Sequence, residues 1–295
     1  MGIWRVSRTD FFATFEYPNH AAAWFYLHAA LAAGMAYDAE IKRKPRIRVA
    51  VFGACFMCCI AASCLTLSRV GAFAALVQLA VVSVMLLFWI RKNLRSEAAL
   101  NAYIGVAIVA LIGVTLFLGA GRGSLAWEVG SKTLLGRQSI AADFSTRAGH
   151  VDCAWEMIKD YPVFGVGAQG CHALAHQYIP EEELRSWMVN GRANVHCDPI
   201  QFLAEFGVVG SLAMALVVAA LVQNMVSARH SALFYWAAGG LALVFVHSLI
   251  DLPFRCPAIL LIWSCLSAAL PCLVSSEHGT GDGMKKAGIL QDVAF

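Results

Sequence analysis

Two arginines occupy positions where a positive charge is unfavourable unless it has a partner or a task. Arg69 lies in a short link between two long apolar segments. There it either snorkels to the edge of a membrane or binds a ligand or anion. Arg147 lies near the start of a predicted helix, where a cation opposes the helix dipole. Both arginines are therefore candidate functional residues.

A histidine lies two positions before an aspartate that marks the start of another predicted helix. Asp198 is followed by Pro199 and then, at the third helical position, by Gln201. This order predicts an N-cap with a capping box, which is a sufficient structural explanation for Asp198. His196 comes just before this rigid helix start, and we treat it as a candidate functional residue.

A third group of polar residues lies at the outer end of a predicted span. His247, Asp251 and Arg255 are spaced four apart, and Pro253 interrupts the helix between the last two. The spacing favours a structural ion-pair cluster, and a functional role is the alternative.

Two further patterns involve histidine and glycine. His172 and His176 share one face of a short predicted helix, as zinc ligands often do, but no third ligand accompanies them. Gly165, Gly167 and Gly170 match the dinucleotide-binding fingerprint, but no strand precedes them. We therefore interpret the histidines as facing solvent or hydrogen-bonding locally, and the glycines as a tight turn where backbone approaches backbone or ligand.

The composition indicates which elements position these residues. Hydrophobic residues make up 59% of the 295 positions and charged residues 14%, whereas a typical soluble domain is about 25% charged. A disordered chain would be more charged and less hydrophobic. The net charge of +3 is small and its basic residues are dispersed, which argues against nucleic-acid binding. We therefore predict an all-α, polytopic membrane protein.

Seven apolar segments are long enough to cross a bilayer, whose roughly 30 Å core requires about 20 residues per helix. The predicted spans are 21–37, 49–67, 72–90, 102–120, 208–225, 231–250 and 256–274. Basic residues gather in the links after the first and third spans, and a few follow the fifth and seventh. Because cytoplasmic links are enriched in basic residues, the intervening polar region 121–207 is predicted to be external.

These spans divide the chain into four predicted regions. Residues 1–120 hold four spans, 121–207 form the external region, 208–274 hold three spans, and 275–295 form a flexible cytoplasmic tail. The external region is too long for a simple connector, which indicates a function.

Within the external region the spacing of apolar residues predicts three helices. The first ends near Asp160 and has an apolar face formed by Ala148, Val151, Trp155 and Ile158. A short helix follows near 172–178, and then an acidic patch, Glu181–Glu183. The third helix begins at Asp198 and has an apolar face formed by Ile200, Leu203 and Phe206.

The cysteines divide into two groups. Seven of the ten lie in apolar segments, where they are expected to behave as small hydrophobic residues. Cys153, Cys171 and Cys197 lie in the external region, and their odd number permits at most one disulfide.

Five segments, in this order, resemble the O-antigen ligase and O-antigen polymerase family of membrane glycosyltransferases. They are Phe15–His20, Leu65–Arg69, Arg147–Gly167, Asn194–Gly207 and His247–Pro253. The similarity covers most of residues 11–270, and 147–210 is its most specific part. The resemblance implies a GT-C-like fold with many transmembrane helices and one large periplasmic loop.

The resemblance also implies an activity in the bacterial inner membrane. An oligosaccharide is transferred from undecaprenyl diphosphate to an acceptor hydroxyl, in O-antigen or surface polysaccharide biosynthesis, without a metal or other cofactor. The expected partners are the lipid-linked glycan donor, a lipid A-core or growing glycan acceptor, and membrane lipids. Ligase, polymerase and protein glycosyltransferase remain open.

The resemblance assigns roles to the candidate residues. His196 matches the family's essential loop histidine, which is expected to activate the acceptor. Arg69 and Arg147 match arginines near the donor diphosphate, whose oxygens a guanidinium binds bidentately. Asp198 and Arg255 complete the predicted substrate-binding residues.

The chain departs from the family pattern in two ways. Family members carry several more spans before the segment Pro18–His20, so the chain is expected to lack N-terminal spans. Cys197 stands where the family often has Asn, which is expected either to alter acceptor positioning or to matter little. The alternatives to this enzyme are a transporter, a degenerate family remnant, or a metal-dependent hydrolase using His172, His176 and His196.

Overall fold

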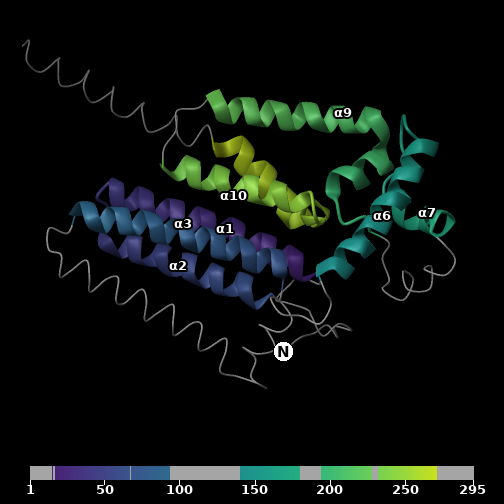
Figure 1. Cartoon of the computed structure of the whole chain (residues 1–295). Coiled ribbons are helices and arrows are strands. Elements are labelled where there is room, and N and C mark those ends of the chain that lie inside the picture. Colours follow the sequence, from purple (N-terminus) through teal and green to yellow (C-terminus); the bar gives the residue numbers. More distant parts are fainter. Residues whose placement is uncertain are drawn as a thin grey trace, which may run out of the picture. The chain divides into compact units, whose positions relative to one another are not determined.

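In a computed structural model, the described part of the chain is built from helices (Figure 1). The structure describes residues 15, 17–66, 68–93, 140–179, 194–227 and 232–270. The predicted fourth span, the acidic patch Glu181–Glu183 and the tail lie outside these ranges. The helices are α1 (Pro18–Ile41), α2 (Arg46–Leu65), α3 (Arg69–Asn93), α6 (Ile140–Asp160), α7 (Gly170–Tyr178), α9 (Asp198–Ser227), α10 (Ala232–Ser248), the short 3-10 helix η1 (Pro253–Arg255) and a last helix at 257–270.

Within these ranges, three helices are long and apolar enough to cross a membrane: Arg46–Leu65, Arg69–Phe88 and Asp198–Val226. Two shorter apolar helices, Leu233–Ser248 and Pro257–Leu270, coincide with the predicted sixth and seventh spans. The all-helical prediction is confirmed for the described residues, and the apolar helices support the membrane-protein class.

The chain divides into two compact units. The first comprises Met1–Ala33 and Gly53–Asp143, and the second comprises Gly34–Phe52 and Phe144–Phe295. Arg69 belongs to the first unit, whereas Arg147, His196, Asp198 and Arg255 all belong to the second.

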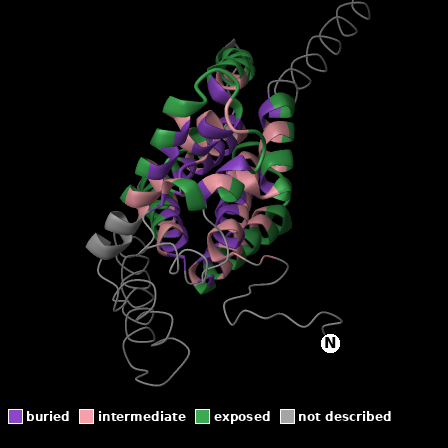
Figure 2. Ribbon diagram, turned by 90° about the vertical axis from the view of Figure 1, so that its right-hand side faces the viewer, coloured by how far each residue is buried: buried purple, intermediate pink, exposed green. Residues whose placement is uncertain are grey.

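The first unit is packed through small residues. Ala22 on α1 is fully buried, and a Cβ added to Gly71 on α3 would lie 2.4 Å from the Ala22 Cβ. The Gln78 side-chain amide on α3 donates a hydrogen bond of 2.8 Å to the Tyr26 carbonyl oxygen on α1. Small residues let helix backbones approach closely in a membrane, where a side-chain amide also needs a partner. Figure 2 shows where buried and exposed residues lie along the helices.

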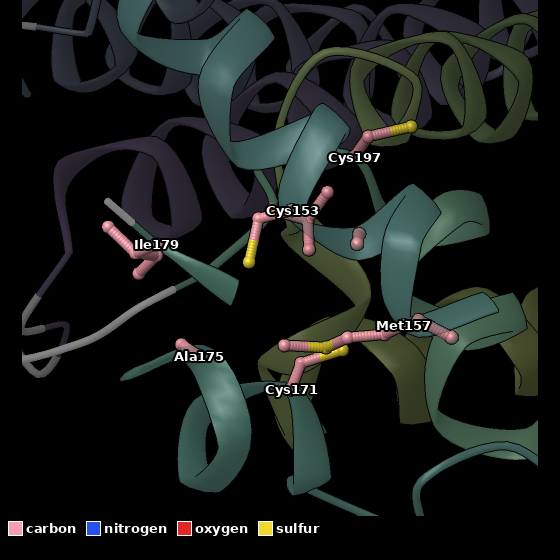
Figure 3. Packing of buried hydrophobic residues seen from close by; sticks show 9 residues of the cluster. Cys153, Met157, Cys171, Ala175, Ile179 and Cys197 are labelled. Atoms are coloured by element: carbon pink, nitrogen blue, oxygen red, sulfur yellow. The ribbon is translucent and has the colours of Figure 1, made fainter. Parts of the chain in front are cut away.

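The second unit has its own core where α6, α7 and the start of α9 meet (Figure 3). The predicted end of the first external helix at Asp160 and the short helix after it are both confirmed by α6 and α7. The buried residues of the core are Cys153, Ala154, Met157, Cys171, Ala175, Ile179, Val195, Cys197 and Ala204.

The predicted apolar face of α6 is buried only in part. Trp155 is half-exposed and Ala148 is exposed, whereas Cys153, Ala154 and Met157 are buried. The reason is that α7 and Val195 approach α6 on the side that carries these smaller, sulfur-rich residues. Val151 and Ile158 only flank this contact.

The three cysteines of the predicted external region are free thiols inside this core. Burial raises the pKa of Cys153 to about 11. Burial is also the main cause that raises the pKa of Cys171, to about 12. Both side chains therefore stay protonated at neutral pH and act as small packing residues.

The helix α9 breaks at Gly207, whose φ of 63° and ψ of −168° are not helical. The first part therefore ends where the predicted external region ends, and the apolar part begins at Val208. Only glycine adopts this backbone conformation readily.

Backbone hydrogen bonds join the glycine-rich turn after α6 to the residues on either side of Gly207. The Val166 N–H donates to the Ala204 carbonyl oxygen at 2.9 Å, and the Val208 N–H donates to the Pro162 carbonyl oxygen at 2.9 Å. Gly165 has φ of 72°, and an added Cβ would lie 2.4 Å from the Glu205 carbonyl oxygen. The interpretation of these glycines as a tight turn against backbone is confirmed.

Candidate functional site

The site is organised around Asp251, in the turn after α10. Its side chain is fully buried, and its backbone N–H donates to the His247 carbonyl oxygen at 2.9 Å. One carboxylate oxygen, Oδ1, accepts the Leu252 N–H at 2.9 Å. A buried carboxylate is stable only when further donors or cations satisfy it, and two predicted site residues supply them.

His196 is the first of these partners. Its Nδ1 lies 3.3 Å from Asp251 Oδ1. Because an ionised carboxylate only accepts hydrogen bonds, Nδ1 is the nitrogen that carries a proton toward Asp251, and Nε2 is the nitrogen that can accept one. The His196 side chain is 24% exposed, so a molecule entering from outside can reach it.

Arg147, on α6, is the second partner. One guanidinium nitrogen lies 3.8 Å from Asp251 Oδ2, and another donates to the Ile250 carbonyl oxygen. The Arg147 side chain is 31% exposed. The structure thus brings together His196 and Arg147, which are 49 positions apart in sequence, on one buried carboxylate (147 to 196).

The charges around Asp251 keep it ionised. Burial alone raises the pKa of Asp251, but the hydrogen bond from His196 and the charges of His196, His247 and Arg147 outweigh it. The net effect lowers the pKa to about 2. Asp251 therefore remains an anion at any physiological pH.

His150, one helical turn after Arg147, was not predicted as a site residue. Its ring stacks on His196, with centroids 5.5 Å apart and an interplanar angle of 20°. Burial, together with the nearby His196 and Arg147, lowers the pKa of His150 from 6.5 to about 4. At neutral pH the stacked partner of His196 is therefore an uncharged imidazole.

The backbone of His196 has a left-handed conformation, with φ of 55°. This conformation costs a residue other than glycine about 1 kcal/mol or more, unless its surroundings fix it. On one side, the Val195 N–H donates to Gln201 Oε1 at 3.1 Å. On the other side, the Asp198 N–H donates to the Asp251 carbonyl oxygen at 3.3 Å. These two bonds hold the segment that presents the His196 ring.

Asp198 and Gln201 do not form the predicted capping box. One Asp198 carboxylate oxygen accepts the Phe254 N–H at 2.9 Å, and Gln201 bonds to Val195 rather than to the first residue of the helix. The Ile200 N–H instead bonds to the Cys197 side chain. Tertiary partners from the turn after α10 and from the segment before α9 have replaced the local pattern.

Arg255 lies beside a second buried carboxylate. Its guanidinium donates to Glu205 Oε1, and the same oxygen accepts a hydrogen bond of 3.2 Å from Gln201 Nε2. Glu205 and Gln201 were not predicted as site residues, because the predicted apolar face of α9 was Ile200, Leu203 and Phe206. Of this face, Ile200 packs against the core but Phe206 is exposed, whereas Gln201 and Glu205 are buried.

The three further candidates are Arg69, His172 and His176. Arg69 begins α3 in the first unit, so its role in substrate binding stays a prediction. His172 and His176 are exposed on α7. In the described ranges, no three His, Cys, Asp or Glu side chains are placed to hold a metal ion.

The chain is similar to one known protein family. The family model described as O-Antigen ligase matches residues 54–215, a range that contains Arg69, Arg147 and His196. No curated protein matches the chain, and no solved structure does.

Proposed function

Since the chain belongs to the O-antigen ligase family, a family of membrane-integral glycosyltransferases, we propose that it transfers an oligosaccharide from undecaprenyl diphosphate to an acceptor hydroxyl. The observation that carries this proposal is the contact of His196 and Arg147 with the buried Asp251. Together these residues offer a proton acceptor and a cation, which are the two groups that this transfer needs.

His196 is the proposed general base. As the acceptor oxygen bonds to the anomeric carbon of the donor sugar, its proton passes to His196 Nε2. Asp251 holds the Nδ1–H tautomer and stabilises the imidazolium that forms, as a carboxylate does in other acid–base pairs. General base catalysis of this kind contributes about 10²–10⁴-fold to the rate.

Arg147 is the proposed ligand of the departing diphosphate. The bond between the anomeric carbon and the phosphate oxygen breaks, and the oxygen leaves with the electron pair. A guanidinium has five N–H donors, and the partial exposure of Arg147 leaves donors for phosphate oxygens beside those on Asp251 and Ile250. Such a fixed cation stabilises the charge that develops in the transition state.

The remaining predicted residues are proposed to bind substrate around this centre. Arg69 is a second candidate for the diphosphate. Asp198 and Arg255, which lie beside the Asp251 turn, are candidates for the sugar or acceptor, because sugars are rich in hydroxyl donors and acceptors. Arg255 is partly exposed, and its contact with Glu205 leaves other N–H groups.

The proposed setting is the bacterial inner membrane, with seven spans in a GT-C-like arrangement and the region 121–207 in the periplasm. The break of α9 at Gly207 supports this setting, because the helix that follows the site turns there into an apolar span. A lipid carrier would then meet the site at the membrane edge. The proposal includes the identity of the donor lipid and of the acceptor, and it covers a ligase, a polymerase or a protein glycosyltransferase.

The test is glycan transfer by His196→Ala, measured with a lipid-linked donor in membranes that contain equal amounts of each variant. His172→Ala is the matched control, because His172 is exposed on α7. We expect transfer to fall by about 10²-fold or more in His196→Ala and to be unchanged in His172→Ala. Wild-type transfer by a folded His196→Ala protein would contradict the assigned mechanism and favour a family remnant or transporter.

A further inference from the structure

The turn that follows α6 is apolar and yet open to its surroundings. Tyr161, Val163 and Phe164 are 48%, 51% and 74% exposed, and Trp155, in the last two turns of α6, is 50% exposed. Four large apolar side chains so close in sequence are unfavourable in water. Such a patch marks a surface that contacts a partner or a membrane.

The backbone of this turn is fixed to the start of the apolar part of α9. The Val208 N–H donates to the Pro162 carbonyl oxygen at 2.9 Å, and the Val209 N–H donates to the Val163 carbonyl oxygen at 3.2 Å. Val208 and Val209 are themselves about half-exposed. They begin the apolar part of α9, which continues to Val226. This part lies within the candidate span Asp198–Val226.

This connection places the turn at a definite depth. If α9 crosses the bilayer from Val208 onward, the backbone bonded to Val208 and Val209 lies where the hydrocarbon region begins. Tyrosine and tryptophan are enriched at that level, because a ring with one polar group suits the boundary between lipid and water. Tyr161 and Trp155 have this chemistry.

Polar groups limit the patch on the side of α6. The exposed Lys159 and Glu156 form an ion pair of 2.7 Å, and the Tyr178 hydroxyl donates to Asp160 at 2.8 Å. Glu156, Lys159 and Asp160 immediately precede the apolar turn, whereas Tyr178 comes after it. A change from charged to apolar side chains within a few residues is typical of a segment that sits in the headgroup region.

We propose that the turn Tyr161–Phe164 is a membrane anchor, which inserts its side chains into the headgroup and acyl boundary of the phospholipid bilayer that α9 crosses. The anchor joins the end of α6 to the membrane surface. Because Arg147 is on the same helix, the anchor fixes the height of the Asp251 centre above the lipid. The inference depends on the membrane location of α9 and not on the transfer chemistry.

The experiment replaces Phe164 by a fluorescent amino acid, using amber suppression in the full chain reconstituted into phosphatidylglycerol and phosphatidylethanolamine vesicles. Emission is compared in vesicles with and without phospholipids brominated near the headgroup end of the acyl chain, and then with aqueous iodide. The same amino acid at His172, exposed on α7, is the control. We expect position 164 to lose about half of its emission or more to brominated lipid, since a side chain at the interface contacts acyl chains.

At position 172 we expect quenching by iodide and little by brominated lipid. The proposal is overturned if position 164 behaves like position 172. It is also overturned if neither quencher affects position 164, which would indicate a protein partner or a second copy on the patch. Tyr161 is the second labelling position should the Phe164 replacement not fold. Quenching reports depth and not turnover, so either result leaves the test of His196 independent.

Discussion

Two buried carboxylates in the second unit each bind an arginine, and they differ in what else they hold. Asp251 is fully buried beside Arg147, and Glu205 is nearly so beside Arg255. Both arginine side chains are 31% exposed. Charge and burial alone therefore do not distinguish the two pairs.

The difference lies in the third partner. Asp251 contacts the ring of His196, whose other nitrogen is left as a proton acceptor. Glu205 instead contacts the Gln201 amide, which accepts the Val195 N–H. The Asp251–Arg147 pair therefore contacts His196, a side chain that can react. The Glu205–Arg255 pair contacts Gln201, which holds the backbone next to His196. An ion pair therefore indicates a functional site only when a titratable and accessible side chain also contacts it.

The largest expected effect comes from Asp251→Asn. Asparagine keeps the shape of the side chain but neither fixes the His196 tautomer nor stabilises the imidazolium. We expect kcat to fall by about 10²–10⁴-fold, with a smaller change in KM for the lipid-linked donor. The measurement is steady-state transfer by purified protein.

Asp152→Asn is the matched control, because Asp152 belongs to the same unit and is exposed on the surface of α6. It should leave kcat unchanged. An Asp251→Asn protein with wild-type kcat and an unchanged melting temperature would remove the distinction between the two carboxylates.

A smaller effect is expected from Gln201→Met, which has similar volume and removes both hydrogen bonds of the side-chain amide. The buried Val195 N–H then loses its acceptor, at a cost of about 1–3 kcal/mol in the free energy of unfolding. We expect kcat to fall less than in Asp251→Asn, and the pH profile of kcat to keep its shape. Chemical denaturation and a pH series of kcat measure these effects.

Gln177→Met, on the exposed face of α7, serves as the control for that substitution. A loss of kcat as large as that of Asp251→Asn, in a protein of unchanged stability, would show that the Glu205 pair acts in the chemistry itself.

The sequence predicted the reacting residues better than it predicted their supports. His196 and Arg147 were both expected at the site, and the structure places both on Asp251. Asp251 itself was assigned to an ion-pair cluster by its spacing from His247 and Arg255. The helix α10 ends at Ser248, before Asp251, and Arg255 pairs with Glu205 instead.

Helix ends were predictable, and helix faces were not. Pro162 and the glycines mark the end of α6 by local rules, and α6 does end at Asp160. The inward face of α9 depends on Arg255, which is 50 positions from Glu205. Local periodicity favours apolar residues for the inside, so it cannot anticipate a polar face whose partner comes from so far along the chain.

The smallest effect concerns the pH dependence of stability. Asp251 and His150 contribute to it in different pH ranges. Because the pKa of Asp251 is lowered to about 2, its contribution to stability is present above about pH 4 and is lost only as the pH falls from there toward 2. The pKa of His150 is lowered to about 4. Between pH 6.5 and 4 the unfolded chain therefore binds a proton at His150 that the folded chain does not.

His150 therefore lowers stability as the pH decreases from 6.5 to 4. Asp198, whose pKa burial raises to about 7, acts in the opposite direction over the same window, so the contribution of His150 is isolated by removing it. His150→Phe keeps a ring to stack on His196 but does not titrate. As the pH decreases over this window, its melting temperature should therefore rise relative to that of the wild type, while the two proteins respond alike between pH 7 and 8. If the melting temperatures of both proteins change by the same amount between pH 6.5 and 4, the pH dependence comes from other groups. The imidazole beside His196, Arg147 and Asp251 is then not held neutral by its burial.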